Sequence, residues 1–565
     1  MKKSKLFSAL TAVILVLSMI LVACTGGSDG GTQETPDTGS TQTTTPDTGT
    51  TTPADTQDPD DDDDSFAGYP MDAMDVTLSF MLWGGPQLHP SIAEWEDSPF
   101  HTGLIRHVGV NIDWMFPPAG AGDEVQGFNL MVASGDYPDI IFSGSLMNDA
   151  ERLIDERVLL DLSPYIRDFA PNYFSFLQEN LARDRAFRTD SGRYFGFGFF
   201  REDAGNDTFQ GPLVRKDLLD ELSLPLPVTI SDWDRTLRAF NDEYGVTFLS
   251  PWARFNGSGN IAGAFGAYGG TQYIVHIDPA DNKVKVAQTA PQWRDYMEQM
   301  SIWWADGLID QDLLTSDDGS IRAKTANNEG GLAYSSMGQL SGWLLDAEEL
   351  GLTTDWIGLD YPQGDDGTKT FVFGGSGIGQ HLAAITTSVG EDRIEYAMRL
   401  LDYAYTPEGS LYWNFGEEGV AWNWEGGVPT FSQLLHDDPD GIHGAMEKYA
   451  GSVWSGPVVQ ATEMLAQRNS PISMGAMRLW GIGNQDVTSN FGLPRGMALS
   501  ADESAKAESI ESAISTYVNE MASRFLTGQE PISNFDSFVS TVESMGLEEL
   551  LSLYQAAYDR YLARN

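Results

Sequence analysis

Apolar and polar residues alternate along short stretches near the start of the chain. Alternation over residues 76–82 predicts a strand ending at the Gly-Gly-Pro turn of residues 84–86, and residues 110–116 repeat the pattern before two prolines. The continuous apolar run 140–142 is typical of a strand buried on both faces. A helical stretch that ends at residues 133–135 lies between the last two strands. This order predicts βαβ units and a parallel sheet.

The middle of the chain has a different pattern. An extended aromatic–glycine run covers residues 192–201, and a second extended run, 211–215, leads directly into a helix. Asp232 and Trp233 open another helix. Residues 275–284 predict a hairpin whose turn begins at Asp278.

Apolar residues at helical spacing mark the longer helices. One face of residues 292–304 carries Trp293, Tyr296, Met300 and Trp304, so we expect the tryptophans of this helix to lie in a core. The same spacing, or a proline at a helix start, predicts further helices over 152–160, from Pro164 onward, and over 394–401, 510–525 and 547–558. The sequence therefore predicts a chain that finishes as helices packed on a core.

The first residues have the pattern of an export signal. Lys2, Lys3 and Lys5 precede an apolar run that ends at Ala23, which predicts a signal peptide over residues 1–23. Leu21-Val-Ala-Cys24 resembles the lipobox of bacterial lipoproteins, in which the cysteine is lipidated with acyl chains such as palmitate and becomes the mature N-terminus. The alternatives are a plain signal peptide with an incidental cysteine and an uncleaved membrane anchor.

A polar, acidic segment follows Cys24. Residues 25–65 hold eleven acidic residues and no basic one, and the sequence Thr-Pro-Asp-Thr-Gly occurs twice there. Such a segment has little apolar surface to bury, so we predict a disordered linker over residues 24–72 and order from about Ala73. The aspartate run 60–64 could suggest calcium binding, but a solvated polyanion explains it more simply.

Composition and charge exclude several classes of function. The chain is 41% apolar and 11% aromatic, enough for a sizeable core, and its net charge is −49, which opposes nucleic-acid binding. With Cys24, the single cysteine, lipidated, disulfides, thiolate zinc sites and cysteine nucleophiles are excluded. The seven histidines show no ligand spacing, and we find no Gly-x-Ser-x-Gly, His-Glu-x-x-His or P-loop motif. We therefore predict no catalytic residue, no metal and no cofactor, although with 82 acidic residues a glycosidase-type carboxylate pair stays open.

Tryptophans are the most informative candidates for a site. The chain has fifteen, several in Gly-, Pro- or Asn-rich contexts, and sugars need flat aromatic platforms beside polar groups. Trp83 and Ser143 with Ser145 follow predicted strands, at the edge where open α/β sheets bind ligands. The other non-periodic tryptophans are Trp252, Trp343, Trp422, Trp424, Trp454 and Trp480.

The chain resembles the extracellular solute-binding lipoproteins of ABC importers, in particular the large Gram-positive branch for oligosaccharides. The resemblance covers about residues 75–560. It is carried, in family order, by Ala133-Ser-Gly-Asp-Tyr-Pro-Asp139, Gly192-Arg-Tyr-Phe-Gly196, Val214-Arg-Lys-Asp-Leu-Leu219, Thr229-Ile-Ser-Asp-Trp233, Trp304-Ala-Asp-Gly-Leu-Ile-Asp310, Leu401-Asp-Tyr-Ala-Tyr-Thr-Pro-Glu-Gly409 and Asn414-Phe-Gly-Glu-Glu-Gly-Val420.

The resemblance implies an α/β, periplasmic-binding-protein-like fold of type II, with two α/β lobes, a hinge and C-terminal helices. The first lobe would hold residues 73–200 and about 360–420, and the second 201–359 and about 421–565. Crossovers are expected after residues 197–201 and near 359–370. The residues expected to bind ligand are Trp83, Ser143, Ser145, Arg201, Trp252, Tyr334, Met337, Trp343, Trp422 and Trp454.

The implied function is capture of an extracellular oligosaccharide by lobe closure and its delivery to an ABC permease. We expect a monomer, not an enzyme, held through Cys24 on the outer face of the cytoplasmic membrane of a Gram-positive cell. Two alternatives stay open, a surface lyase or glycosidase and a non-transport sugar sensor or adhesin. The tryptophan interpretation predicts that replacing Trp83 or Trp422 with alanine weakens sugar binding but leaves the ligand-free melting temperature largely intact.

Overall fold

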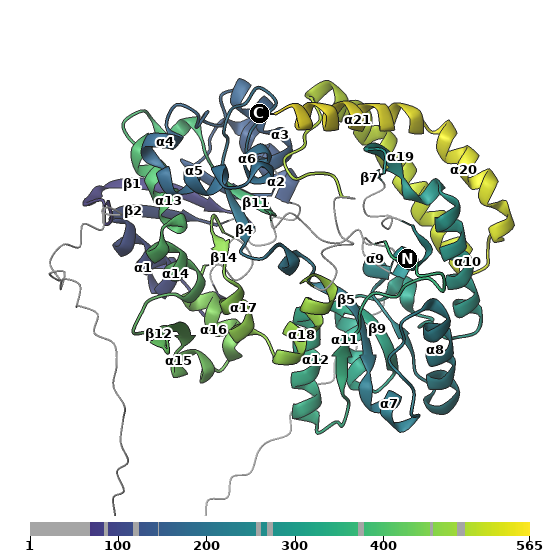
Figure 1. Cartoon of the computed structure of the whole chain (residues 1–565). Coiled ribbons are helices and arrows are strands. Elements are labelled where there is room, and N and C mark those ends of the chain that lie inside the picture. The colour runs from purple at the N-terminus through teal and green to yellow at the C-terminus, as the bar shows by residue number, and fades with distance from the viewer. Residues whose placement is uncertain are drawn as a thin grey trace, which may run out of the picture. The chain divides into compact units, whose positions relative to one another are not determined.

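The computed structural model describes residues 68–83, 89–116, 124–144, 146–255, 261–267, 275–278, 280–370, 378–451, 456–482 and 492–564. The predictions for the signal peptide, Cys24, the linker up to residue 67, Ser145 and Trp454 lie outside these ranges. Within them, helices surround two main sheets and two hairpins (Figure 1).

The larger sheet has six strands in the order β14-β4-β11-β3-β1-β2. Its strands are β1 Ala73–Leu82, β2 Val110–Met115, β3 Ile140–Ser143, β4 Phe197–Arg201, β11 Ile378–Ile385 and β14 Val459–Gln460. β1 pairs in parallel with β2 and β3, and helices α1 (Pro99–Val108) and α2 (Glu124–Ser134) connect the three strands. The predicted βαβ units are therefore confirmed. β11 is antiparallel to both of its neighbours.

The first core is the hydrophobic cluster built on this sheet, and it includes Phe80, Ile141 and Phe197. Its helices are α3 Leu146–Asp155, α4 Ile166–Phe169, α5 Pro171–Gln178, α6 Leu181–Ala186, α13 Ile394–Asp402 and α14 Pro407–Phe415. The helix predicted over 152–160 ends earlier, at Asp155, because Arg157 adopts a positive φ of 59° and Leu160 donates its N–H to Ile385 of β11.

The second core surrounds a four-stranded sheet in the order β10-β5-β9-β6. The strands are β5 Gln210–Arg215, β6 Thr247–Leu249, β9 Gly330–Ser336 and β10 Trp356–Gly358. The helices are α7 Lys216–Glu221, α8 Ile230–Tyr244, α9 Trp252–Phe255, α10 Pro291–Ala305, α11 Asp318–Ala326, α12 Met337–Leu350, α19 Ala501–Leu526, α20 Phe535–Ser544 and α21 Leu547–Ala563. The predicted hairpin is β7 (Val275–Asp278) with β8 (Lys283–Val286).

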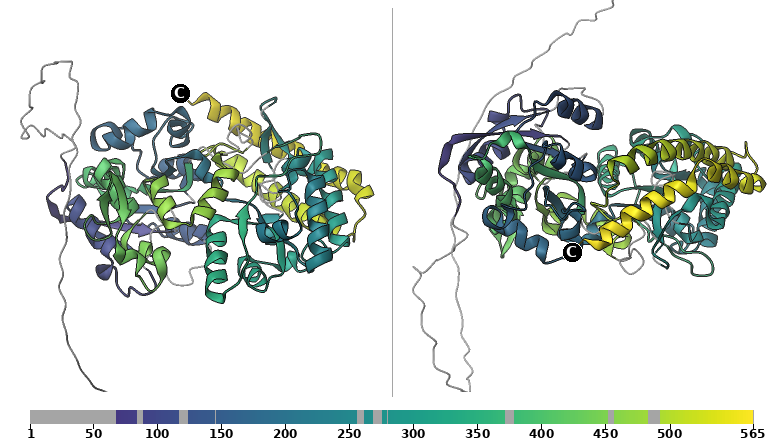
Figure 2. Two further views of the ribbon diagram at one scale, coloured as in Figure 1. Left: turned by 60° about the horizontal axis from the view of Figure 1, so that its bottom comes forward. Right: turned by 90° about the horizontal axis from the view of Figure 1, so that it is seen from above.

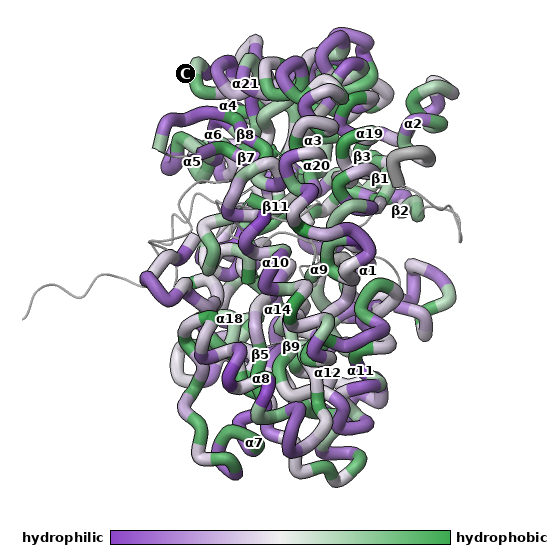
Figure 3. The backbone as a smooth tube through the Cα atoms, turned by 90° about the vertical axis from the view of Figure 1, so that its right-hand side faces the viewer, coloured by the Kyte–Doolittle hydropathy of each residue, from purple (hydrophilic) through white to green (hydrophobic). Residues whose placement is uncertain are grey.

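Local sequence signals explain where these helices begin and which face they bury. Thr229 and Asp232 form a capping box at the start of α8, and Pro291 occupies the first turn of α10. In α10, Trp293 and Trp303 are buried as expected, whereas Trp304 is only partly buried against the second core. Hydrophilic and hydrophobic residues are interspersed along helices such as α8 and α10 (Figure 3). The C-terminal helix α19 packs against α20 and α21 (Figures 1 and 2).

A third core lies around the hairpin β12 (Trp422–Glu425) and β13 (Val428–Phe431). Its helices are α15 Gln433–His436, α16 Gly441–Tyr449, α17 Thr462–Arg468 and α18 Pro471–Trp480. α18 belongs to two cores, because Met474 and Met477 join the third core while Ala476 and Trp480 join the second. No sequence pattern predicted this separate hydrophobic cluster.

Short 3-10 helices complete the described chain. They are η1 Trp95–Asp97, η2 Ala204–Asp207, η3 Ile261–Phe265, η4 Ala287–Thr289, η5 Leu313–Thr315, η6 Thr387–Val389, η7 Tyr403–Tyr405 and η9 Ile532–Asn534. Among the described residues, no helix has the length and apolar content needed to cross a membrane.

The chain passes between the two sheets more than once. It leaves the larger sheet after β4, enters β5, and rejoins the larger sheet at β11. The sequence placed everything after about residue 421 in the second lobe, yet β14 pairs in parallel with β4. A strand of two residues carries no periodic pattern, so the third passage was expected near residue 421, before β14, although β14 still belongs to the larger sheet.

Candidate functional site

The carboxyl ends of five strands meet at one edge of the six-stranded sheet, which we call the first edge. β1, β2 and β3 are parallel, and β4 runs with them because β3 and β4 are both antiparallel to β11. β14 is parallel to β4. The first edge therefore carries Trp83, Ser143, Arg201 and Gln460. In open α/β sheets, ligands bind at such carboxyl ends.

Trp83 and Ser143 occupy neighbouring places on the first edge. The Trp83 N–H donates to the Phe142 carbonyl over 2.8 Å, which fixes the residue beside the end of β3. The Trp83 ring lies against α2 at Gly127, where a Cβ would be only 2.2 Å from the ring. Trp83 is 8% exposed and Ser143 is fully buried, so the end of β3 is covered and only part of the indole reaches the surface.

Arg201 ties together three segments that meet at the first edge. Its Nε lies 2.6 Å from Asp207 Oδ1 of η2, and its guanidinium donates to Gln460 Oε1 of β14 over 2.8 Å. The rings of Phe199 and Phe209 lie 5.4 and 5.8 Å from the guanidinium carbon. Burial lowers the pKa of Arg201 and the Asp207 carboxylate acts in the opposite direction. These contacts connect Arg201 to the crossover after β4, and its predicted contact with ligand stays a prediction.

Further hydrogen bonds hold the same crossover. The Glu202 carboxylate accepts the N–H of Thr462, and the Asn206 side chain donates to the Thr462 hydroxyl over 3.0 Å. Asp207 and Gln460 were not singled out from the sequence. Asp207 is one aspartate among many in an acid-rich chain, and Gln460 lies in a two-residue strand, so no sequence pattern pointed to either residue.

The four-stranded sheet has an equivalent second edge. β6 and β9 are parallel, and β10 runs with β9 because both are antiparallel to β5. The carboxyl ends of β6, β9 and β10 therefore meet where β5 begins at Gln210. Trp252 follows β6 and stacks on Phe255 at 6.0 Å, and Met337 follows β9; both are partly buried.

Tyr334 lies near the end of β9 and is 1% exposed. Its hydroxyl is 3.3 Å from the Tyr361 hydroxyl, which donates to the Gln210 carbonyl over 2.6 Å. Burial raises the pKa of Tyr361, so this hydroxyl stays protonated and acts as a donor. Tyr334, Met337 and Trp252 thus bring neutral hydroxyl, thioether and aromatic groups to the second edge. Its link to the start of β5 includes Tyr361, which the sequence did not indicate.

Two further tryptophan candidates, Trp343 and Trp422, lie inside cores. Trp343 of α12 is 3% exposed and packs edge-on against Trp356 at 5.4 Å. Trp422 is 2% exposed and donates from Nε1 to the Gly416 carbonyl over 2.9 Å. These two residues lie within a helix and a strand, not in loops. Their predicted contact with ligand stays a prediction, but the observed burial supports a packing role.

Trp480 is fully buried and contacts both β5 and the residue that follows β10. Its Nε1 lies 2.9 Å from the Leu359 carbonyl and 3.2 Å from the Pro212 carbonyl. Trp424, in contrast, is 50% exposed on the hairpin of the third core.

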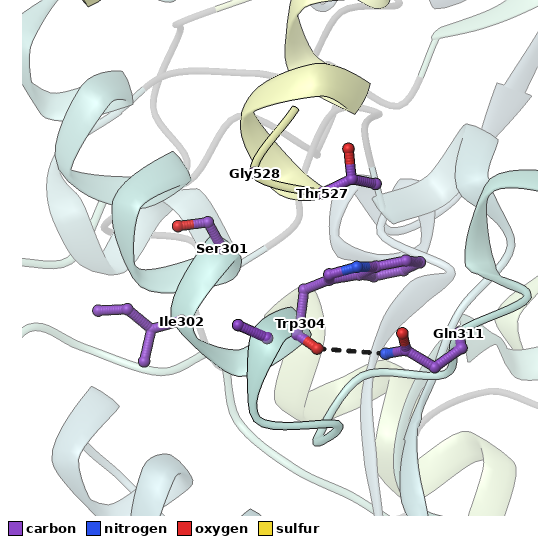
Figure 4. Close-up of a pocket in the computed structure, with 7 residues that line it drawn as sticks. Ser301, Ile302, Trp304, Gln311, Thr527 and Gly528 are labelled. Carbon is purple, nitrogen blue, oxygen red and sulfur yellow. Dashed lines mark hydrogen bonds between the residues drawn. The ribbon is translucent and has the colours of Figure 1, made fainter. Parts of the chain in front are cut away.

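A surface pocket of about 480 Å³ lies between the ends of α10 and α19 (Figure 4). Trp304 lines it with polar side chains that already donate to backbone carbonyls: Ser301 to Glu298, Gln311 to Ile309 and Thr527 to Ser523. None of the described residues that line this pocket is charged. This pocket therefore offers fewer groups that could bind a ligand than either edge does. Among the described residues, no group of three or more His, Cys, Asp or Glu side chains is placed to hold a metal ion.

Comparison with known proteins identifies relatives of this chain. No protein-family model matches it. It is 22% identical over 483 residues to the fructooligosaccharide ABC transporter substrate-binding protein FusA of Streptococcus pneumoniae, covering 81% of this chain and 86% of the relative. It is also 22% identical over 360 residues to lipoprotein LipO of Bacillus subtilis, covering 59% of this chain and 66% of LipO.

A solved structure shows the same fold. The HMO-binding, ABC-transporter-associated solute-binding protein of Bifidobacterium longum infantis superposes with a TM-score of 0.69 at 16% identity, over 86% of this chain and 99% of that one. The predicted type II fold is thereby confirmed. The resemblance drawn from the sequence motifs is confirmed as well: the chain is similar in sequence to the substrate-binding protein of an ABC transporter, and it shares the fold of a solute-binding protein.

Proposed function

We propose that this protein is the substrate-binding component of an ABC importer and that it captures an extracellular oligosaccharide for delivery to a membrane permease. The observation that carries the proposal is the placement of the two edges. The chain leaves the first edge at Arg201 and enters β5 at the second edge at Gln210, so the connection between them is short. Two ligand-binding edges joined by a short crossover suit a protein that closes on its ligand.

The chemistry of the edges supports a carbohydrate ligand. Trp252 offers a partly exposed aromatic ring at the second edge, and Trp83, which is 8% exposed, brings only part of its ring to the surface at the first edge; sugar rings stack on such surfaces. Arg201 is already paired with Asp207, so it presents little free positive charge to an anionic ligand. FusA, the relative with the longest matched segment reported above, is named for a fructooligosaccharide. We propose Trp83, Trp252 and Met337 as ligand contacts, with Arg201 as a positioning residue.

The export signal and Cys24 complete the proposal. LipO is named as a lipoprotein, and the Leu-Val-Ala-Cys24 motif fits lipidation of this cysteine. Two acyl chains of a diacylglyceryl group would hold the protein at the outer face of the membrane, near its permease. The acidic linker would give the folded part reach. We propose that it acts there as a monomer and turns over no substrate, as its relatives are binding proteins.

A binding screen tests this proposal. The probes are kestose, nystose, alginate oligosaccharides and mannose oligosaccharides, each added to the purified protein while its melting temperature is followed. A bound sugar raises the midpoint because it binds only the folded state. We expect at least one of these sugars to raise it, with titration calorimetry then giving one site per chain.

Two controls make the screen decisive. Trp252→Ala should abolish the shift, whereas Trp424→Ala, which removes an exposed tryptophan from the third-core hairpin, should retain it. Mass analysis of each sugar after incubation should show it unchanged. A cleaved product, or the absence of any shift across neutral and acidic oligosaccharides, would contradict the proposal.

A further inference from the structure

Besides the backbone crossovers, a cluster of charged side chains links the first and second cores, and we call it the Arg564 clamp. It consists of Arg560 and Arg564 at the end of α21, Asp190 in the turn before β4, and Glu503 of α19. α21 belongs to the second core through Leu550 and Tyr561, among others. The turn belongs to the first core, which contains Phe187 and Tyr194 on either side of Asp190. Figure 1 shows the end of α21 beside the elements of the first core.

Arg564 is the centre of the clamp, and its side chain is only 2% exposed. The guanidinium donates to Asp190 Oδ1 over 2.6 and 2.9 Å. It also donates to the carbonyls of Arg185, Arg188 and Gly496, over 3.0, 2.7 and 2.8 Å. In return, Arg185 Nε donates to the Arg564 carbonyl over 2.8 Å. A buried guanidinium with this many acceptors is held in one geometry by both cores.

Arg560 strengthens the same contact from one helical turn earlier. Its Nε donates to Asp190 Oδ2 over 2.8 Å, while its other nitrogens donate to both oxygens of Glu503 over 2.9 and 2.5 Å. Backbone packing adds to it, because a Cβ on Gly496 would lie 2.1 Å from the Ala186 carbonyl. Gly496 also has a φ of +75°, which glycine adopts without strain.

The clamp engages the first core on the far side of β4 from Arg201. Asp190 lies in the turn that precedes β4, and the crossover leaves from the carboxyl end of that strand. The clamp and the Arg201–Asp207–Gln460 cluster therefore hold the two ends of the same segment. Only the Arg564 side of the pair is buried, at 2% exposure against 30% for Asp190, so removing the Asp190 carboxylate would leave a buried guanidinium without its carboxylate partner.

We propose that the Arg564 clamp is a noncovalent pivot. It stays formed while the first and second cores move toward each other when ligand binds. The cores would then rotate about a hinge that is formed by the clamp and by the backbone crossovers. The ligand-dependent part of this proposal rests on the proposed function, whereas the role of the clamp in holding the cores together does not.

The first test needs no ligand. Asp190→Asn removes the shared carboxylate, and Asp346→Asn is its matched control, since Asp346 pairs with Arg322 inside the second core alone, over two bonds of 2.6 Å. In the ligand-free protein we expect Asp190→Asn to increase the radius of gyration in X-ray scattering. We also expect faster hydrogen exchange in residues 187–194 and 555–564. The control should change neither. An unchanged radius and exchange in Asp190→Asn would overturn the proposal.

The second test uses a sugar found in the binding screen, such as kestose. A pivot pre-orders the cores, so its loss should weaken binding by about 5-fold or more, in the range of common coupling energies. If ligand binding instead required the clamp to break, Asp190→Asn would bind the sugar more tightly than the wild type. Tighter binding would therefore overturn the proposal that the clamp is a pivot. If Asp190→Asn does not fold, Arg560→Gln, at a side chain 35% exposed, replaces it with the same expected signs. If no sugar binds the wild type, the proposed function fails while the scattering result still decides the clamp.

Discussion

Trp83 and Trp422 lie in two different regions, although sequence patterns predicted the same role for both. Trp83 follows a strand at the first edge, where the carboxyl ends of parallel strands meet. Trp422 begins a hairpin strand in the third core, where Phe415 lies 5.9 Å from its ring and its Nε1 donates to a backbone carbonyl. The absence of helical periodicity around a tryptophan therefore does not place it in a ligand site; its position relative to the sheet does.

The same distinction sorts the other tryptophans. Trp252 follows a strand at the second edge and is partly exposed. Trp343 and Trp480 lie on helices and face cores. If this comparison is right, substitutions in the cores should act on stability, and substitutions at the edges should act on binding.

The largest effect is expected for Trp480→Ala. The ring is fully buried and its Nε1 reaches the carbonyls of Leu359 and Pro212. Losing the ring should lower the free energy of unfolding by about 5 kcal/mol, since a large cavity forms and two carbonyls lose a donor. Urea denaturation measures this. Trp480→Phe, which keeps most of the ring, should lose about 1–3 kcal/mol; an alanine variant as stable as the wild type would disprove the packing role.

Trp422→Ala comes next, with an expected loss of about 3–4 kcal/mol in the free energy of unfolding. This outcome differs from the sequence-based prediction that the ligand-free melting temperature stays intact, because the residue is 2% exposed. The measurement is a denaturation curve in the absence of sugar. An unchanged midpoint together with a weaker affinity would restore the platform role and break the comparison.

Much of the fold could be predicted because its signals are local. The alternation in β1 and β2 and the apolar run in β3 predicted the parallel strands, and spacing in α10 and α13 predicted those helices. Sequence periodicity reports one face of one element at a time. It therefore identified the elements but not the third core, whose small cluster is assembled from Phe415, Met446 and Met477, far apart in the chain.

The candidate site was less predictable for a physical reason. Strand ends could be read from the sequence, and so Trp83 and Ser143 were placed at an edge, whereas Met337 was expected only from the family resemblance. Burial depends on which segments pack against a residue, and neither Trp422 nor Arg201 carries that information locally. Arg201 contacts Asp207 and Gln460. Gln460 belongs to β14, a strand that no sequence pattern predicted.

A smaller effect, this time on binding, is expected for Trp83→Phe at the first edge. The smaller ring should weaken sugar affinity by about 1 kcal/mol, since stacking area is lost, while the cost in stability stays below about 1.5 kcal/mol. Trp343→Phe is the matched control, the same change within the second core. It should cost similar stability and leave the affinity in calorimetry unchanged. Equal affinities for both variants would remove Trp83 from the site.

The smallest effect is expected for Trp424→Ala. This ring is 50% exposed, and its centroid lies 5.3 Å from that of the Trp422 ring. Its removal should change the free energy of unfolding and the sugar affinity by less than about 0.5 kcal/mol each, as for most exposed positions. Denaturation and calorimetry on the same preparation measure both. A tenfold loss of affinity would instead place a ligand contact on the third-core hairpin, and the distinction between edges and cores would no longer predict which tryptophans bind.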